Sequence, residues 1–297
     1  MTKLTTLFCL GLLAAGRLSA HAAGDAKATE LLGQARAALG GDAALAKVQG
    51  LSCVGTIGRL LGDRQVTGEL TIDLQLPNRM LRSDSISPLG DVVLVTEQGL
   101  NGDTLLQNTK TMNVPPGAVI RTPPPPQAGS DAEAQALRNA RAELARLTVA
   151  LLLVAPSSMP LEFSYGGTAE SPDGKADVID VKGPSAFAAQ LFLDASTHRP
   201  LMLAYKGVAP QIRVQTRQGP PPPASAGAQG RADGPPGQAQ APQVVDIKLF
   251  LDDYRSVNGV LLPHHVTRAI DGQTNEEWTF KTIRVNPAFK AESFSVK

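Results

Sequence analysis

The strongest constraint in this sequence is a long-range alternation of apolar and polar residues. Apolar residues occupy every second position through most of residues 66–76 and 245–252. Successive side chains of a β-strand point to opposite faces, so each segment is predicted to be a strand with one face in water and one against apolar material. The pattern favours an antiparallel sheet and disfavours a doubly wound α/β fold, in which helices alternate with strands.

Two-residue turn signals separate the alternating segments. Each pairs Asn or Asp with Gly, which supplies the positive φ angles that tight hairpin turns require. We therefore expect a meander of antiparallel hairpins with about ten strands and helices over one face. The four signals are Asn101-Gly102, Asp173-Gly174, Asn258-Gly259 and Asp271-Gly272.

Helical signals are few. Asp25 can cap a helix that runs through Leu39 and stops at Gly40-Gly41, and residues 42–48 can form a second, short helix. The best-marked helix begins at Ser130, where residues 130–133 have the pattern of a capping box. Apolar residues then recur at spacings of three and four as far as Leu151, which is typical of an amphipathic helix.

Two Pro-rich segments interrupt this plan, at residues 115–129 and 219–243. They lack the apolar residues needed for a core, so we interpret them as disordered surface loops. A mobile hinge in the first segment and a polyproline docking site are the alternatives. We expect residues 23–297 to form a single β domain.

The amino terminus has the features of an export signal. Lys3 precedes an apolar stretch, and Ala20-His21-Ala22 offers small residues for signal-peptidase cleavage after residue 22. The apolar stretch is shorter than the about 20 residues that a membrane span needs. The sequence therefore predicts a signal peptide at residues 1–22, a periplasmic protein and no stable membrane insertion.

Composition limits the partners. The net charge of +1 argues against nucleic acid, which requires a basic surplus. Only 4% of residues are aromatic, so any binding surface is mostly aliphatic. Cys53 is the one cysteine beyond the export signal, so it has no internal disulfide partner, and its apolar neighbours favour burial as a small hydrophobe.

The sequence offers no strong catalytic motif. It has no Gly-rich phosphate loop, serine elbow or paired-cysteine metal spacing, so we expect no catalytic residue, metal or cofactor. One alternative is a metal-dependent hydrolase built on His264, His265, Glu276 and Glu277, which face one another across a hairpin. Because these residues place two ligands on one face and a catalytic zinc site needs three, a cross-strand polar pair is the simpler interpretation.

The apolar face of the sheet is the remaining candidate site. If the few helices cover it only partly, an aliphatic cavity forms of the kind that binds acyl chains; if they cover it fully, the core is closed. Arg79 and Arg82 are candidates to gate the cavity by bonding to carbonyls of a lid, or else edge charges that prevent aggregation. The predicted lining residues are Val66, Leu70, Ile72, Leu74, Val245, Ile247, Leu249 and Leu251.

Several motifs resemble those of bacterial outer-membrane lipoprotein-sorting-like proteins (the LolA/LolB-like group). Residues 253–264 read DYRSVNGVLLPH, and the chain continues with EWTF at 277–280 and VNPAFK at 285–290. Residues 39–48, LGGDAALAKV, and 193–201, LDASTHRPL, are similar to two further segments of that group. The resemblance implies a curved half-barrel sheet with helices as a lid over a hydrophobic cavity.

The resemblance also implies a function. Members of known role carry lipoprotein acyl chains across the periplasm or sense mislocalised lipoproteins, without catalysis. We therefore expect a periplasmic carrier or sensor whose partner is a lipid or acylated lipoprotein. The alternative is an interaction module with a closed core that engages an envelope protein. The two Pro-rich segments are not part of the carriers' usual pattern.

Overall fold

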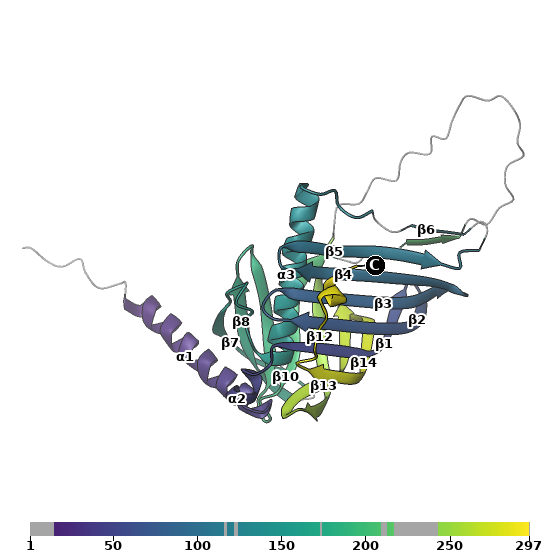
Figure 1. Ribbon diagram of the computed structural model, residues 1–297. Coiled ribbons are helices and arrows are strands. Elements are labelled where there is room, and N and C mark those ends of the chain that lie inside the picture. Colours follow the sequence, from purple (N-terminus) through teal and green to yellow (C-terminus); the bar gives the residue numbers. More distant parts are fainter. Residues whose placement is uncertain are drawn as a thin grey trace, which may run out of the picture.

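The protein is described here by a computed structural model that covers residues 15–115, 118–121, 124–172, 174–208, 213–216 and 243–296. Most of the described chain belongs to one antiparallel sheet of twelve strands (Figure 1). The sheet runs in the order β5-β4-β3-β2-β1-β14-β13-β12-β10-β9-β8-β7, so β5 and β7 are its edges. Its strands are β1 (Gly50–Leu61), β2 (Arg64–Gln75), β3 (Arg79–Leu89), β4 (Val92–Asn101), β5 (Thr104–Met112), β7 (Glu162–Ser171), β8 (Gly174–Gly183), β9 (Phe187–Asp194), β10 (Pro200–Val208), β12 (Val244–Val257), β13 (Val260–Ile270) and β14 (Gln273–Val285).

The predicted turns join neighbouring strands. Asn258 and Gly259 have φ angles of 49° and 83° between β12 and β13, and Asp271 and Gly272 have 47° and 83° between β13 and β14. Gly102, at 64°, makes the turn between β4 and β5. Positive φ at these positions explains why Asn, Asp and Gly occupy them. Of the four predicted signals, only Asp173 lies outside the described residues.

Three α-helices and one short 3₁₀ helix accompany the sheet: α1 (Ala15–Ala38), α2 (Asp42–Leu45), α3 (Asp131–Leu152) and η1 (Ala291–Phe294). The predicted start of α3 is confirmed, because the Glu133 amide donates to the Ser130 hydroxyl at 3.2 Å. The Glu133 carboxylate accepts from the Gly129 amide at 2.6 Å. The helix ends at Leu152, and the next residue, Leu153, has a left-handed φ of 56°.

α1 begins earlier than the sequence predicted. It starts at Ala15 rather than at Asp25, and Asp25 lies inside the helix, where its carbonyl accepts a bond from the Thr29 hydroxyl. The preceding residues include four alanines, and strong helix formers allow the helix to extend past a potential cap. α2 ends at Leu45, three residues before the predicted end. Lys3 lies outside the described residues, and cleavage after Ala22 stays a prediction.

The first Pro-rich segment is also more ordered than expected. β6 (Ala118–Arg121) falls within it and pairs antiparallel with β11 (Arg213–Thr216) in a separate two-stranded sheet. Val119 and Ile120 are β-favouring residues between the prolines, which is consistent with a strand here. Nearly all of the second Pro-rich segment, residues 219–242, lies outside the described residues.

α3 lies against the concave face of the sheet. It contacts β4 and β5 at one end of the strand order and β9 and β10 near the other end. One helix reaches both groups of strands because the sheet curves around it (Figure 1). The predicted curved, open antiparallel sheet covered by helices is confirmed.

A single large core joins the sheet to the helices. α1 packs beside β7 and contributes Leu31, Leu32 and Ala35, while α3 contributes Leu144, Leu147 and other residues of its second half. Cys53 is buried in the same core, and burial raises the pKa of its thiol to about 12. Among the described residues, no helix is long and apolar enough to cross a membrane.

Candidate functional site

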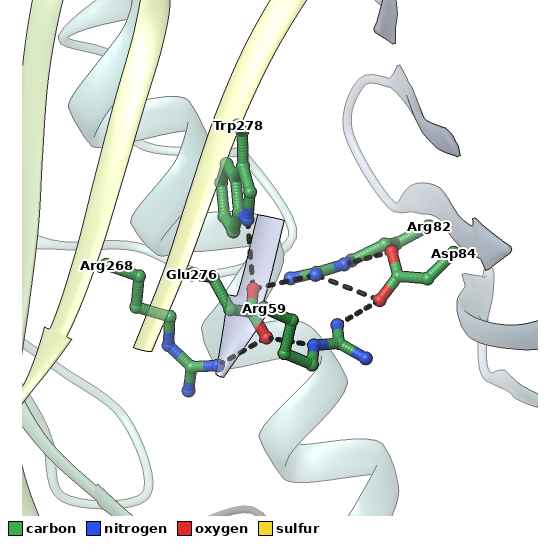
Figure 2. Close-up of polar contacts among 6 residues, drawn as sticks. All are labelled: Arg59, Arg82, Asp84, Arg268, Glu276 and Trp278. Carbon is green, nitrogen blue, oxygen red and sulfur yellow. Dashed lines mark hydrogen bonds and ion pairs between the residues drawn. The ribbon is translucent and has the colours of Figure 1, made fainter. Parts of the chain in front are cut away.

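Five charged side chains gather on the concave face of the sheet. Arg59 of β1 and Arg268 of β13 lie opposite Glu276 of β14, one on each neighbouring strand. Arg82 and Asp84 stand two positions apart on β3, so their side chains point to the same face. The strand register therefore brings three arginines and two carboxylates together, and Figure 2 shows them turned toward one another.

Most members of this group are joined by charge-assisted hydrogen bonds. Arg82 donates from Nε to Asp84 Oδ1 at 2.9 Å and from Nη2 to Asp84 Oδ2 at 3.0 Å. Its Nη2 also donates to Glu276 Oε2 at 2.8 Å. Arg59 donates to Glu276 Oε1 at 3.0 Å through Nε and bonds to Asp84 through Nη2. Trp278 completes the arrangement by donating from Nε1 to Glu276 Oε2 at 2.9 Å (Figure 2).

These pairings are important for stability because both carboxylates are buried. Asp84 is only 2% exposed and Glu276 only 3%, and a buried charge without a partner is strongly unfavourable. Burial alone raises the pKa of Glu276, but Arg82, Arg59 and Arg268 outweigh it and hold this pKa well below its usual range. Glu276 therefore stays ionised, and the formal charges of three arginines and two carboxylates leave one positive charge in excess.

The excess charge is least well paired at Arg268. Its Nη1 lies 3.5 Å from Glu276 Oε1, its side chain is 17% exposed, and its buried Nε has no hydrogen-bond partner within the described part of the chain. Arg146 of α3 is similar, since its Nη1 lies 3.4 Å from Glu143 Oε2 and its buried Nε has no partner there either. The Arg146 guanidinium lies 4.0 Å from the ring centroid of Tyr205, within cation–π range.

A cavity of about 490 Å³ opens beside these two arginines, between the part of α3 from Ala136 to Leu147 and the concave face of the sheet. Its apolar wall includes Met80, Leu105, Leu147 and Ile247. Its polar lining includes Arg82, Arg146, Arg268, Tyr205, Gln98 and Gln107. This volume lies within the range of about 300–1,000 Å³ that is common for small-molecule sites.

The last turns of α3, around Leu151, leave almost no space between the helix and the sheet. A void of about 10 Å³ lies between Leu147 and Leu151 of the helix and Ile72, Leu249 and Leu251 of the sheet. A void of that size is at the limit for one water molecule and holds no acyl chain. The concave face is therefore filled at one end of α3 and hollow at the other.

All eight residues that the sequence predicted to line a cavity are buried, as an inward-facing parity requires. Of these eight, Ile247 borders the 490 Å³ cavity, and Ile72, Leu249 and Leu251 border the small void. The remaining four are packed in the core: Val66, Leu70, Leu74 and Val245. The lining role of the eight stays a prediction that requires α3 to move.

The two candidate gate arginines lie in different environments. Arg79 is exposed and donates to the Gln75 side chain at 3.3 Å, whereas Arg82 is bound to carboxylates as described above. Arg36 of α1 bonds to a carbonyl beside α3 instead, because its Nε and Nη2 lie 3.3 and 3.2 Å from the Leu153 oxygen just after the helix. Arg36 was not among the candidates predicted from the sequence.

The histidine and glutamate pairs do not form a shared site. His264 is buried, with Nδ1 3.1 Å from the Leu262 carbonyl. His265 contacts the hydroxyls of Thr279 and Thr267, and Glu276 is held by arginines. Across the described ranges, no three His, Cys, Asp or Glu residues are grouped so that they could hold a metal ion.

The buried charges carried a signal that the sequence analysis did not use. Arg82 and Asp84 share the parity of Met80 and Ile86 on β3, the side that is buried. Charged residues on the apolar parity of a strand indicate a buried polar network rather than edge protection. Arg146 gave no comparable signal, because its role depends on which face of α3 meets the sheet.

Comparison with known proteins finds similar solved structures but no matching sequence. No family model and no curated protein matches the sequence. Among solved structures, a domain named for outer membrane lipoprotein sorting from Vibrio parahaemolyticus is similar, with a TM-score of 0.42 and 8% identity over 91% of this chain and 97% of that one. A LolA superfamily protein from Nitrosomonas europaea has a TM-score of 0.44 and 7% identity over 91% and 97%.

A DUF1329 family protein from Desulfovibrio piger is also similar, with a TM-score of 0.44 and 7% identity over 90% of this chain and 97% of that one. The first two of these names belong to the group that the sequence motifs resemble. At these scores and identities the likenesses carry no argument about function, which rests on the geometry of the site.

Proposed function

We propose that this protein binds the acyl chain of a lipid or lipoprotein between α3 and the concave sheet, as a non-catalytic carrier or sensor in the periplasm. The observation that carries the proposal is the 490 Å³ cavity, whose wall combines the half-buried first part of α3 with apolar residues of the sheet. An amphipathic helix over a hollow apolar surface is an arrangement in which a hydrocarbon chain replaces water.

The free energy gained when apolar groups leave water favours an acyl ligand over a small polar one. Each methylene that leaves water contributes about 0.8 kcal/mol, and the cavity wall offers Met80, Leu105 and Leu147 as contacts. A chain longer than the cavity must displace Leu147 or Leu151 from the core. Because the chain then makes the apolar contacts that those leucines lose, the exchange is close to balanced, and a ligand can lift α3 without a large net penalty.

A closed-core interaction module is the second candidate function. The observation in its favour is the close packing of the last turns of α3 on the sheet, where only about 10 Å³ remains between helix and sheet. In that case, α3 is a permanent part of the core and the binding surface lies elsewhere, with an envelope protein as partner. The two candidates differ in whether a hydrocarbon chain enters the cavity.

A matched pair of tryptophan variants on α3 tests the proposal. Ala140 borders the cavity and Ala134 is exposed on the same helix. Ala140→Trp fills the hollow and is expected to weaken binding of palmitate at least tenfold, whereas Ala134→Trp leaves it unchanged. Isothermal titration with palmitate measures both. Equal affinity in the two variants, or no palmitate binding by the unmodified protein, contradicts the proposal.

A further inference from the structure

We infer that the cavity recognises an amphiphile with a single negative charge on its head group, a carboxylate or a phosphodiester, held by Arg146 and Arg268. This inference rests on the proposed function, because it names the class of lipid that the cavity takes. Three features of the site support it: an unbalanced charge, two weakly paired arginines, and an apolar wall beside them.

The charge balance around the cavity leaves one positive unit. Arg59, Arg82 and Arg268 face Asp84 and Glu276, and Arg146 faces Glu143. The set has four arginines and three carboxylates. Lys206 also borders the cavity, but its ammonium is exposed and paired with Asp246 at 2.8 Å. One monovalent anion therefore neutralises the group.

Tyr205 of β10 lines the same cavity as the two arginines. The guanidinium of Arg146 lies over the Tyr205 ring, and Arg268 of β13 lines that cavity too. The side chains of Arg146 and Arg268 are 16% and 17% exposed. The nearest carboxylate oxygen that each one faces among the described residues lies at 3.4 Å for Arg146 and 3.5 Å for Arg268. Both ion pairs are long, so an anion in the cavity can give each guanidinium a closer charge-assisted hydrogen bond.

The position of the arginines also sets the shape of the ligand. Leu147 is the next residue along α3 after Arg146, and Met80 and Leu105 line the same cavity. A planar guanidinium binds a carboxylate or phosphate through two parallel hydrogen bonds. A head group at the arginines therefore leaves its hydrocarbon chain against the apolar wall, so head and tail are recognised together. A neutral lipid leaves the positive charge unpaired.

Four probes test this inference by isothermal titration with the full chain. Palmitate carries head and tail, hexadecanol carries the tail without charge, and acetate and inorganic phosphate carry the head without a tail. The expected result is that palmitate binds at least tenfold more tightly than hexadecanol, and that acetate and phosphate bind at least a hundredfold more weakly than palmitate. Equal binding of palmitate and hexadecanol overturns the inference and leaves the proposed function intact.

Other outcomes separate the remaining possibilities. If acetate or phosphate binds as tightly as palmitate, the site takes a free anion, and the amphiphile assignment is wrong. If neither palmitate nor hexadecanol binds, the proposed function itself fails. The preference of the unmodified protein for palmitate over hexadecanol needs no variant, so it stays informative even where a substitution prevents folding.

Arginine variants then locate the preference. Arg146→Gln and Arg268→Gln are expected to reduce palmitate binding about tenfold each while hexadecanol binding changes less than twofold. Arg255→Gln is the matched control, because Arg255 is exposed and paired with Asp253 on β12. A preference for palmitate that persists in the Arg146→Gln, Arg268→Gln double variant overturns the assignment of these two residues.

Discussion

The two halves of α3 meet the same sheet in different ways. From Leu144 to Leu152 every residue of the helix except Arg146 is buried, and about 10 Å³ remains beneath its last turns. Between Asp131 and Glu143 its residues are exposed or half-buried, and a cavity of about 490 Å³ lies beside it. The difference indicates that one end anchors the helix while the other end borders the space that a ligand enters.

The buried ion network lies near the boundary between the two regions, and breaking it should have the largest effect. Glu276→Gln removes a charge that Arg59 and Arg82 both use. The substitution leaves Arg59 and Arg82 to share Asp84 and removes the carboxylate that Arg268 faces, so the free energy of unfolding should fall by about 3–5 kcal/mol. Glu277→Gln, at an exposed neighbouring position, is the control. Urea denaturation measures both; a loss below 1 kcal/mol for Glu276→Gln contradicts a structural role for the network.

The same network predicts acid sensitivity. The pKa of Glu276 is well below its usual range in the folded protein, so the stability from its ionised form is present above the unfolded pKa. That stability is lost as the pH falls through the lower folded pKa. Thermal melts from pH 7 to pH 3 should show a steeper fall in Tm for the unmodified protein than for Glu276→Gln. Parallel curves contradict the assignment.

Leucine truncations on α3 test whether its two halves contribute differently to the free energy of unfolding. Leu144 is fully buried and Leu137 is half-buried. Leu144→Ala should lower the free energy of unfolding by about 3 kcal/mol, and Leu137→Ala by about 1 kcal/mol or less. Equal losses in urea denaturation would mean that both halves are equally anchored.

The bond from α1 to the end of α3 should have the smallest effect. Arg36→Gln removes the donors to the Leu153 carbonyl and should lower the free energy of unfolding by about 1.5 kcal/mol. Arg79→Gln, an exposed arginine whose partner is Gln75, should change it by less than about 0.5 kcal/mol. If Arg79→Gln lowers the free energy of unfolding more than Arg36→Gln does, the Arg36 bonds do not stabilise the end of α3.

The parts of this fold that local chemistry determines were accessible from the sequence. Alternation and Asn-Gly or Asp-Gly turns predicted the strands around Asn258 and Asp271, and Ser130 predicted the start of α3. The start of α1 was predicted wrongly, because Asp25 has the chemistry of a cap but lies inside a helix that contains many alanines.

The site was less accessible, because it depends on which distant strands become neighbours. Arg59 and Glu276 are 217 positions apart in the chain and meet only through the register of β1 with β14. The depth at which α3 sits on the sheet decides whether Leu249 lines a cavity or packs in the core. Alternation is identical in the two cases, so the sequence predicted that Leu249 is buried but not what it faces.

The central claim is that a hydrocarbon chain enters the space beside α3. Native mass spectrometry of the protein, exported to a bacterial periplasm and purified without detergent, tests it most directly. We expect acylated species to co-purify with the protein in near-stoichiometric amount, to be lost in Ala140→Trp and to be kept in Ala134→Trp. If the protein is empty and also takes up no added palmitate, no hydrocarbon chain enters the space beside α3.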